Sequence, residues 1–256
     1  MEVLAQLLPE SVALWAAGLV IVASFFTAAL TAAFGLGGGL ALLAVMSAVF
    51  PAAAVIPVHG AAQAGANAGR LYLQRKDVVW RIVAIFSLGG LVGAGLGGRL
   101  AVDAPVWLLR GGVGAFILFT VWGPKPKSFA PGVWTFFLTG VAAGFLTMFF
   151  GATGPIAATM LSATALARLN IVATHAAAMV IQHVTKITAF GLLGFAYTEW
   201  AWLIAAILIS GFAGTYAGTH YLRAMPEATF RRGFKAILTA IAIYLLIAAA
   251  IGVRTG

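Results

Sequence analysis

The chain has 256 residues, of which 62% are hydrophobic and only 8% are charged. Because soluble domains carry about 25% charged residues, this composition excludes a soluble globular protein. The net charge of +9 does not indicate a nucleic-acid partner, since the cations are scattered at the ends of apolar runs, as membrane loop anchors are. The absence of cysteine excludes disulfides, thiol chemistry and Cys-ligated metals.

Apolar runs of about 20 residues recur along the chain, and each can cross a bilayer as a helix. The first run lacks a preceding basic segment, so we interpret it as a membrane helix rather than a cleaved signal. In chain order the predicted segments are 12–34, 40–50 (short), 58–73 (short), 78–101, 106–122, 133–150, 156–166 (short), 171–195, 200–222 and 230–253. A Pro-flanked break at 51–57 separates the first two short segments, and the linker "GPKPKSFAPG" (123–132) lies near the middle.

The two halves share motifs in the same order, which predicts a duplicated unit. "FGLGGG" (34–39) recurs as "FGATGP" (150–155), and "HGAAQAGANAGR" (59–70) matches "HAAAMVIQHVTK" (175–186), both at an offset of 116. "GLVGAGLGGRL" (90–100) and "LLRGG" (108–112) recur at offsets of 121 and 122. The predicted units are 1–123 and 133–256, joined by a loop at 124–132. We interpret the glycine strings in the third motif as close helix packing.

The distribution of Lys and Arg predicts the orientation of the chain. If the N-terminus is outside, most cations lie inside: Arg75, Lys76, Arg81, Lys125, Lys127, Arg223, Arg231, Arg232 and Lys235. Each half then crosses the membrane three or five times, depending on whether its short pair re-enters or spans. Both numbers are odd, so the second unit must be inverted. We expect an all-α polytopic membrane protein with two inverted repeats, each with three full transmembrane helices plus a pair of short helices, and with both termini outside.

The broken segments are candidate substrate sites, because such breaks form the sites of inverted-repeat transporters. Their turns present N–H groups at the start of a short helix, where the dipole favours an anion. The residues that supply these backbone groups are Gly37, Gly38, Gly39, Thr153 and Gly154. The structural alternative is that these residues only permit tight turns and close packing.

Polar residues in apolar segments mark substrate or ion paths. Two sets each share one helix face, because their members are three, four or seven positions apart. The first set is His59, Gln63, Asn67 and Arg70. The second set is His175, Gln182 and Lys186, with His183 beside it. We expect the two faces to form two walls of one substrate-binding site.

Structural alternatives remain for several of these residues. Arg70 could reach the membrane interface, and the histidines could bond to backbone carbonyls. Arg168 and Asn170 lie in the break of the second half. Arg168 is a direct candidate for binding an anion if that break re-enters the membrane, and an ordinary loop residue if it reaches the surface.

The positions of the carboxylates point to the charge of the substrate. All six lie at segment ends or in loops: Glu2, Glu10, Asp77, Asp103, Glu199 and Glu227. The membrane interior therefore has no carboxylate for a proton relay or a hard-metal site. A cationic or neutral interior suits an anion and argues against a cation pump. Proton coupling would fall to histidine, and sodium bound by carbonyls stays open.

At these motifs the sequence resembles the TauE/SafE sulfite-exporter family. The resemblance rests on "FGLGGG", "KDVVWR" (76–81), "GGLVGAGLGGRL" (89–100) and "DAPVWLLRGG" (103–112), and on "FGATGP", "GFAGTYAGTHYL" (211–222) and "MPEATFRRGFK" (225–235) in the second half. The second glycine motif departs from the family's triplet, and His59 and His175 stand where many relatives have small hydroxyl residues. The resemblance implies outward transport of small sulfur-containing or organic anions, such as sulfite, sulfonates or sulfoacetate, across a bacterial inner membrane.

The sequence therefore predicts a secondary transporter of small anions, working by alternating access at a midplane site between the repeats. A passive anion channel of the same fold is the close alternative. A membrane enzyme, which would have to use His175 and His183, and a purely structural membrane partner are the others. We expect no enzymatic activity, no cofactor and no bound metal. The exact anion, the coupling ion (proton or sodium), the direction of flux and a homo-oligomeric state stay open.

Overall fold

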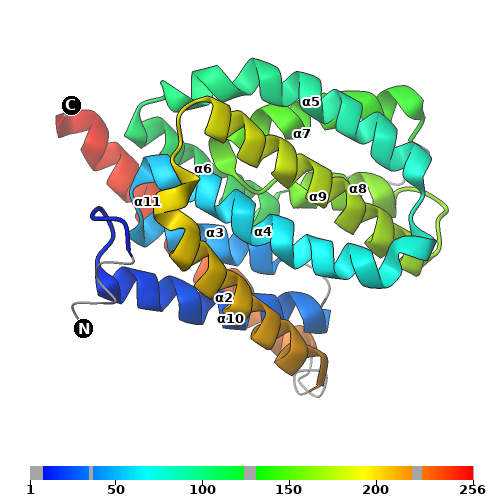
Figure 1. Cartoon of the computed structure of the whole chain (residues 1–256), viewed down its shortest axis with the longest axis horizontal. Coiled ribbons are helices and arrows are strands. Elements are labelled where there is room, and N and C mark those ends of the chain that lie inside the picture. The colour runs from blue at the N-terminus through cyan, green and yellow to red at the C-terminus, as the bar shows by residue number, and fades with distance from the viewer. Residues whose placement is uncertain (1–7, 35–36, 124–130, 221–226, 256) are drawn as a thin grey trace.

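The computed structural model describes residues 8–34, 37–123, 131–220 and 227–255, and these residues form ten α-helices and no strand (Figure 1). The helices are α2 (Leu14–Phe34), α3 (Gly38–Val49), α4 (Ala52–Gln74), α5 (Trp80–Val102), α6 (Val106–Trp122), α7 (Val133–Phe150), α8 (Gly154–Ser162), α9 (Arg168–Leu192), α10 (Ala201–His220) and α11 (Glu227–Thr255). Short 3₁₀ helices η1 (Arg75–Asp77) and η2 (Tyr197–Trp200) follow α4 and precede α10. Most of the predicted linker, with Lys125 and Lys127, and also Arg223, lies outside the described residues.

Four segments are long and apolar enough to cross a membrane, which confirms the prediction of a multi-pass helical protein. They are Leu14–Ala32, Trp80–Val102, Val133–Phe150 and Tyr197–Gly218. The third long helix predicted in each half has an apolar segment shorter than these four spans. The segment is Val106–Trp122 in α6 and Leu238–Gly252 in α11. At 1.5 Å per residue, the 17 residues of α6 rise about 26 Å, slightly less than a hydrocarbon core of about 30 Å.

The first helix of each short pair is too short to cross the membrane. α3 has 12 residues and α8 has nine, which correspond to rises of about 18 and 14 Å. The second helix of each pair is long, with 23 residues in α4 and 25 in α9. The prediction of a short segment at 58–73 is therefore wrong. The helix begins directly after Pro51 and continues through Pro57, since membrane helices tolerate an interior proline where neighbouring groups satisfy the freed carbonyl.

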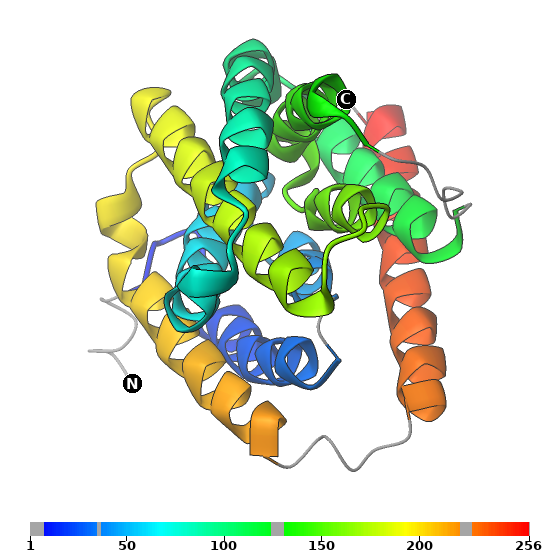
Figure 2. The same ribbon diagram turned by 90° about the vertical axis from the view of Figure 1, so that its right-hand side faces the viewer.

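Four helix pairs form the main interfaces: α5 with α7, α2 with α10, α6 with α11, and α4 with α9. Viewed end-on, the first three pairs lie around α3, α4, α8 and α9 (Figure 2). α3 is apolar on all sides, and its Leu43, Ala44 and Met46 have no exposed surface. A helix with that composition belongs in the interior, and the packing of α3 places its glycine-rich start inside the protein.

Glycines bring two of these pairs into backbone contact. A Cβ at Gly93 or Gly97 of α5 would collide with the α7 backbone at Val141 or Phe145. In the same way, a Cβ at Gly214 or Gly218 of α10 would collide with α2. The α2 residues at these two contacts are Phe25 and Ala29. The prediction that the glycine strings serve close helix packing is confirmed.

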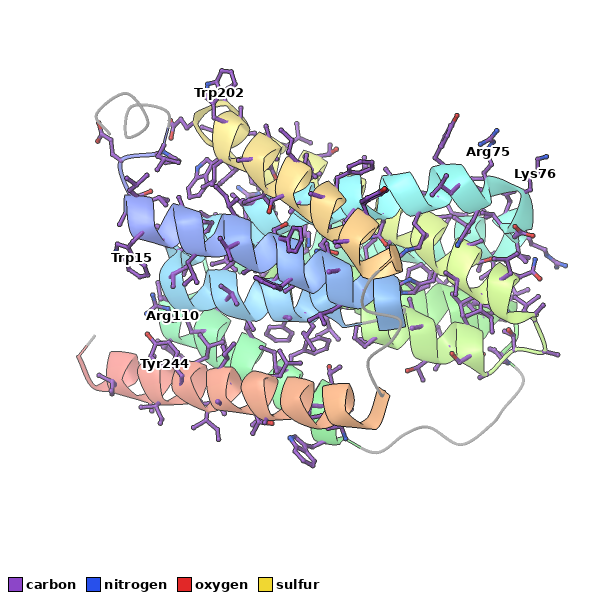
Figure 3. All side chains as sticks on the ribbon, turned by 90° about the horizontal axis from the view of Figure 1, so that it is seen from below. Trp15, Arg75, Lys76, Arg110, Trp202 and Tyr244 are labelled. Atoms are coloured by element: carbon purple, nitrogen blue, oxygen red, sulfur yellow. The ribbon has the colours of Figure 1, made fainter. Side chains whose placement is uncertain are left out.

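The helices run roughly along the long axis, and the start of α2 lies at the same end of the molecule as the end of α11. Figure 3 shows Arg75 and Lys76 at the opposite end from Trp15, Arg110 and Trp202. The two ends therefore differ in character, with the basic turn after α4 at one of them.

Candidate functional site

Two histidines make equivalent contacts with the short helices. Nε2 of His59 in α4 lies 2.8 Å from the Gly39 carbonyl oxygen in the first turn of α3. Nε2 of His175 in α9 lies 3.1 Å from the Gly154 carbonyl oxygen at the start of α8. A carbonyl oxygen only accepts, so Nε2 donates in both rings and Nδ1 is left as an acceptor. Each long helix is thus tied to the start of the short helix beside it.

The starts of α3 and α8 have no capping side chain. Gly37 precedes α3 with φ at 103°, and Thr153 precedes α8; neither makes a side-chain cap hydrogen bond. The Thr153 hydroxyl instead donates to the Ala143 carbonyl oxygen at 3.2 Å. First-turn N–H groups have no acceptor within their own helix. Those of Gly38 and Gly39 therefore stay available to a ligand. In α8 only the N–H of Gly154 does, because Pro155 has none and the N–H groups of Ile156 and Ala157 bond to the Thr153 carbonyl oxygen.

Lys186 is the largest side chain with essentially no exposed surface among those that the structure describes. Its ammonium donates to the Gly151 carbonyl oxygen at 2.7 Å. Gly151 ends α7 with φ at 74°, and its carbonyl also accepts from the Thr147 hydroxyl at 3.3 Å. An ammonium has three donors, so this one contact leaves capacity for a ligand.

Gly60 of α4 makes room for this lysine. A Cβ there would lie 2.8 Å from Lys186 Cε and 3.7 Å from its Cδ. Sequence reasoning did not identify Gly60 or Gly151 as site residues. The available signals were the position of Gly60 next to His59 and that of Gly151 within the repeated "FGATGP" motif.

His183 of α9 joins the cluster through His59. The two ring centroids are 6.1 Å apart with an interplanar angle of 80°. Both rings are buried, and Nδ1 of each has no hydrogen-bond partner. Unsatisfied buried polar atoms are rare in native proteins and need an explanation, such as a ligand or ordered water.

Gln182 links α9 to the start of α8. Its Nε2 donates to the Thr153 hydroxyl at 2.8 Å, while its Oε1 is buried without a partner. Gln182 lines a cavity of about 10 Å³ between α5, α7 and α9, together with Ser87, whose Oγ is also unpartnered. That volume accommodates about one water molecule. The polar cluster is therefore closely packed on this side.

The remaining predicted residues divide into two groups. In α4, Gln63 lies against Gly39, Asn67 donates to the Gln63 carbonyl oxygen at 2.8 Å, and Arg70 is half-buried within electrostatic range of His175. Asn170 donates instead to the Asp77 carbonyl oxygen at 2.9 Å, which ties α9 to the turn after α4. Arg168 begins α9, and its side chain lies outside what the structure describes.

These contacts define a helical membrane protein with a buried cationic and histidine-rich cluster where two long helices meet two uncapped short ones. The family model for the sulfite exporter TauE/SafE matches residues 20–245. The chain therefore belongs to the TauE/SafE family, and the family identifies it as a membrane transport protein of the sulfite-exporter type. No curated protein and no solved structure matches it significantly.

Proposed function

We propose that this protein is a secondary transporter that exports small sulfur-containing or organic anions, such as sulfite, sulfonates or sulfoacetate. The anion binds between the two halves, at Lys186, the surrounding histidine and amide groups, and the uncapped starts of α3 and α8. The cluster is His59, Gln63, Asn67, Arg70, His175, Gln182, His183 and Lys186, with Gly37, Gly38, Gly39, Thr153 and Gly154 supplying backbone groups.

The observation that carries this proposal is the burial of Lys186 without a carboxylate partner. Among the described residues its one hydrogen bond goes to a neutral carbonyl, and Glu10, Asp77, Asp103 and Glu199 lie in turns or short 3₁₀ segments. A buried charge is costly unless it is paired. A transported anion supplies the missing counter-charge, so the ionic interaction of Lys186 is made with the substrate.

The helix contacts support two inverted repeats, divided at about 124–132. In chain order, α2, α4, α5 and α6 of the first half correspond to α7, α9, α10 and α11 of the second. If the halves are exchanged, the α5–α7 interface becomes the α10–α2 interface, while the α4–α9 and α6–α11 interfaces stay the same; these are the four main interfaces. The glycine contacts follow the same rule, because Phe25 and Val141 are 116 positions apart, as are Ala29 and Phe145. Transporters built this way move one repeat against the other around a central site.

The proposed orientation puts the end with Arg75 and Lys76 in the cytoplasm of a bacterial cell and both termini outside. It rests on the positive-inside rule and on the separation of that basic turn from Trp15 and Trp202. The close packing around Gln182 supports a carrier, which occludes its substrate, over an open channel. Coupling would use a proton at the buried histidines or a sodium ion at carbonyl oxygens.

The test combines binding and flux. Purified protein is heated with sulfite, sulfate, thiosulfate, taurine, sulfoacetate or short carboxylates, since a ligand of the folded state raises Tm by mass action. Uptake of the stabilising anion into liposomes is then measured. We expect saturable flux that Lys186→Met lowers about tenfold to a hundredfold, the loss of a charged hydrogen bond. Lys76→Met, the same change at an exposed lysine, should have little effect.

Other outcomes separate the alternatives. Unchanged binding and flux in Lys186→Met would remove the proposed site. Flux that neither saturates nor depends on a counter-ion would favour a channel, and a metal-dependent turnover would favour an enzyme.

A further inference from the structure

A second small cavity lies between α3, α4 and α6, away from the Lys186 cluster. Its volume is about 10 Å³, and its lining residues are Ser47, Ala52, Val55, Ile56, Leu109, Arg110 and Val113. It is at the end of the molecule that carries Trp15 and Trp202. Since Ala52 and Arg110 are only half-buried, the cavity reaches the surface there. The space fits one water molecule or one oxygen atom of a larger ligand.

The cavity holds a cation without a counter-charge. Arg110 is in the second turn of α6, and the structure gives its guanidinium no hydrogen bond or ion pair with any described residue. Five N–H donors in a planar fork are suited to binding an oxyanion. An arginine can be unpaired because its guanidinium extends to the membrane interface. That explanation does not account for the other polar groups that line the cavity, Ser47 and the start of α4.

Ser47 of α3 lines the same space and is 4% exposed. Its Oγ is buried and has no hydrogen-bond partner. Serine in a helix can bond back to a carbonyl one turn earlier, so an unpartnered hydroxyl that lines the same cavity as an arginine indicates a missing acceptor. An oxyanion supplies that acceptor.

The start of α4 adds backbone donors. Pro51 precedes the helix with no side-chain cap, and Ala52 lines the cavity. The N–H of Ala54 bonds to the Pro51 carbonyl oxygen, whereas first-turn N–H groups before it have no acceptor within the helix. The dipole of the 23-residue α4 favours an anion at this end.

We propose that this cavity is a second anion site, on the face opposite the Arg75–Lys76 turn. An oxyanion places one oxygen inside, where Ser47 Oγ, the Arg110 guanidinium and the α4 N-terminus donate to it, and its other oxygens stay at the surface. A free sulfite or sulfate ion and the phosphate of a lipid headgroup share this chemistry. The site stands on its own residues and does not depend on Lys186.

The test uses full-length protein that carries Lys186→Met, which removes the central cation. In detergent, sulfite and sulfate should still raise Tm in a saturable way. Adding Arg110→Gln should weaken this response about tenfold, near 1.4 kcal/mol, and Ser47→Ala should weaken it severalfold. Arg99→Gln, an exposed arginine near the end of α5, is the matched control and should change nothing.

Lipid nanodiscs separate the two sources of the anion. If phosphatidylglycerol stabilises the protein more than phosphatidylcholine does, and Arg110→Gln removes the difference, the ligand is a headgroup; if only free anions act, it is a solute. The proposal is overturned if the Lys186→Met protein gives no saturable response to either source, or one that Arg110→Gln leaves intact. If Arg110→Gln by itself removes the rise in Tm that anions cause in the wild-type protein, while Lys186→Met does not, the anion site at Arg110 is supported and the proposed transport site at Lys186 is rejected.

Discussion

At the scale of single residues, the position of Lys186 depends on two glycines from other helices. Gly60 leaves the volume that the lysine stem crosses, and Gly151 turns its carbonyl toward the ammonium. A left-handed backbone such as that of Gly151 is accessible to glycine without strain. The ammonium is thus held by a backbone carbonyl rather than by an opposite charge, and in the proposed site it would exchange that carbonyl for an anion.

Gly60→Ala should weaken anion binding about tenfold, or about 1.4 kcal/mol, without unfolding the protein. The new methyl group would lie against Lys186 Cε, the far part of a flexible side chain, so the ammonium should move while the helices stay in place. Isothermal titration with the anion identified by thermal stabilisation measures the effect. The matched control is Gly69→Ala, where a methyl group meets nothing within 4 Å. Equal affinities in the two variants would contradict this placement of Lys186.

At the scale of helices, small residues decide which helices pair. Lipid tails are as apolar as leucine, so helices in a bilayer associate by close packing rather than by hydrophobic burial. The α5–α7 and α2–α10 interfaces use glycine for this purpose, and Ser24 and Ser210 add bonds across the second one, to the carbonyl oxygens of Ile207 and Ile21 at 2.8 and 2.6 Å. These pairs form a stable frame beside the α4–α9 cluster.

Gly93→Ala should lower the stability of the protein by about 1–3 kcal/mol, the usual effect of overpacking, because the methyl group would collide with the Val141 carbonyl. For a chain of this size that is a fall in Tm of roughly 2–12 °C, measured on detergent-purified protein. Gly95→Ala is the control, since its methyl group meets nothing within 4 Å. It should be neutral or stabilising by up to about 1 kcal/mol. A Gly93→Ala protein as stable as Gly95→Ala would refute close contact between α5 and α7.

At the scale of the whole molecule, cysteine labelling can test which end of the protein faces which side of the membrane. The chain has no cysteine, so single cysteines report their own positions. Lys76 and Trp202 are both exposed and lie at opposite ends, which makes them a matched pair of reporters.

Trp202→Cys should react with a membrane-impermeant maleimide in intact bacterial cells, because it lies at the end proposed to face outward. Lys76→Cys should react only after the cells are permeabilised, since the basic turn should face the cytoplasm. Labelled protein is quantified after purification. The reversed pattern would invert the proposed orientation, and equal labelling of both sites in intact cells would indicate a mixed topology.

Much of the fold could be predicted because the bilayer imposes strict rules on sequence. Unpaired backbone groups are not tolerated in lipid, so the apolar runs had to be helices. The repeated motifs predicted where the chain breaks, and His59, His175 and Lys186 stood out as polar residues in apolar surroundings. Sequence reasoning was wrong about the length of α4, because the helix continues through Pro57. Proline is a weaker helix breaker in a membrane helix than in a soluble one, because neighbouring helices and side chains can satisfy the freed carbonyl.

By itself, the sequence determined that this is a helical membrane protein of the TauE/SafE family, with polar faces in corresponding positions of its two halves. Those properties depend on composition, periodicity and motif order, which are local. Only the tertiary structure decided that α5 pairs with α7 and α2 with α10. It also decided that Lys186 reaches the Gly151 carbonyl past Gly60, and that Asn170 bonds to the Asp77 carbonyl oxygen rather than joining the Lys186 cluster. Such contacts join residues up to almost 190 positions apart, and close packing of whole helices selects them.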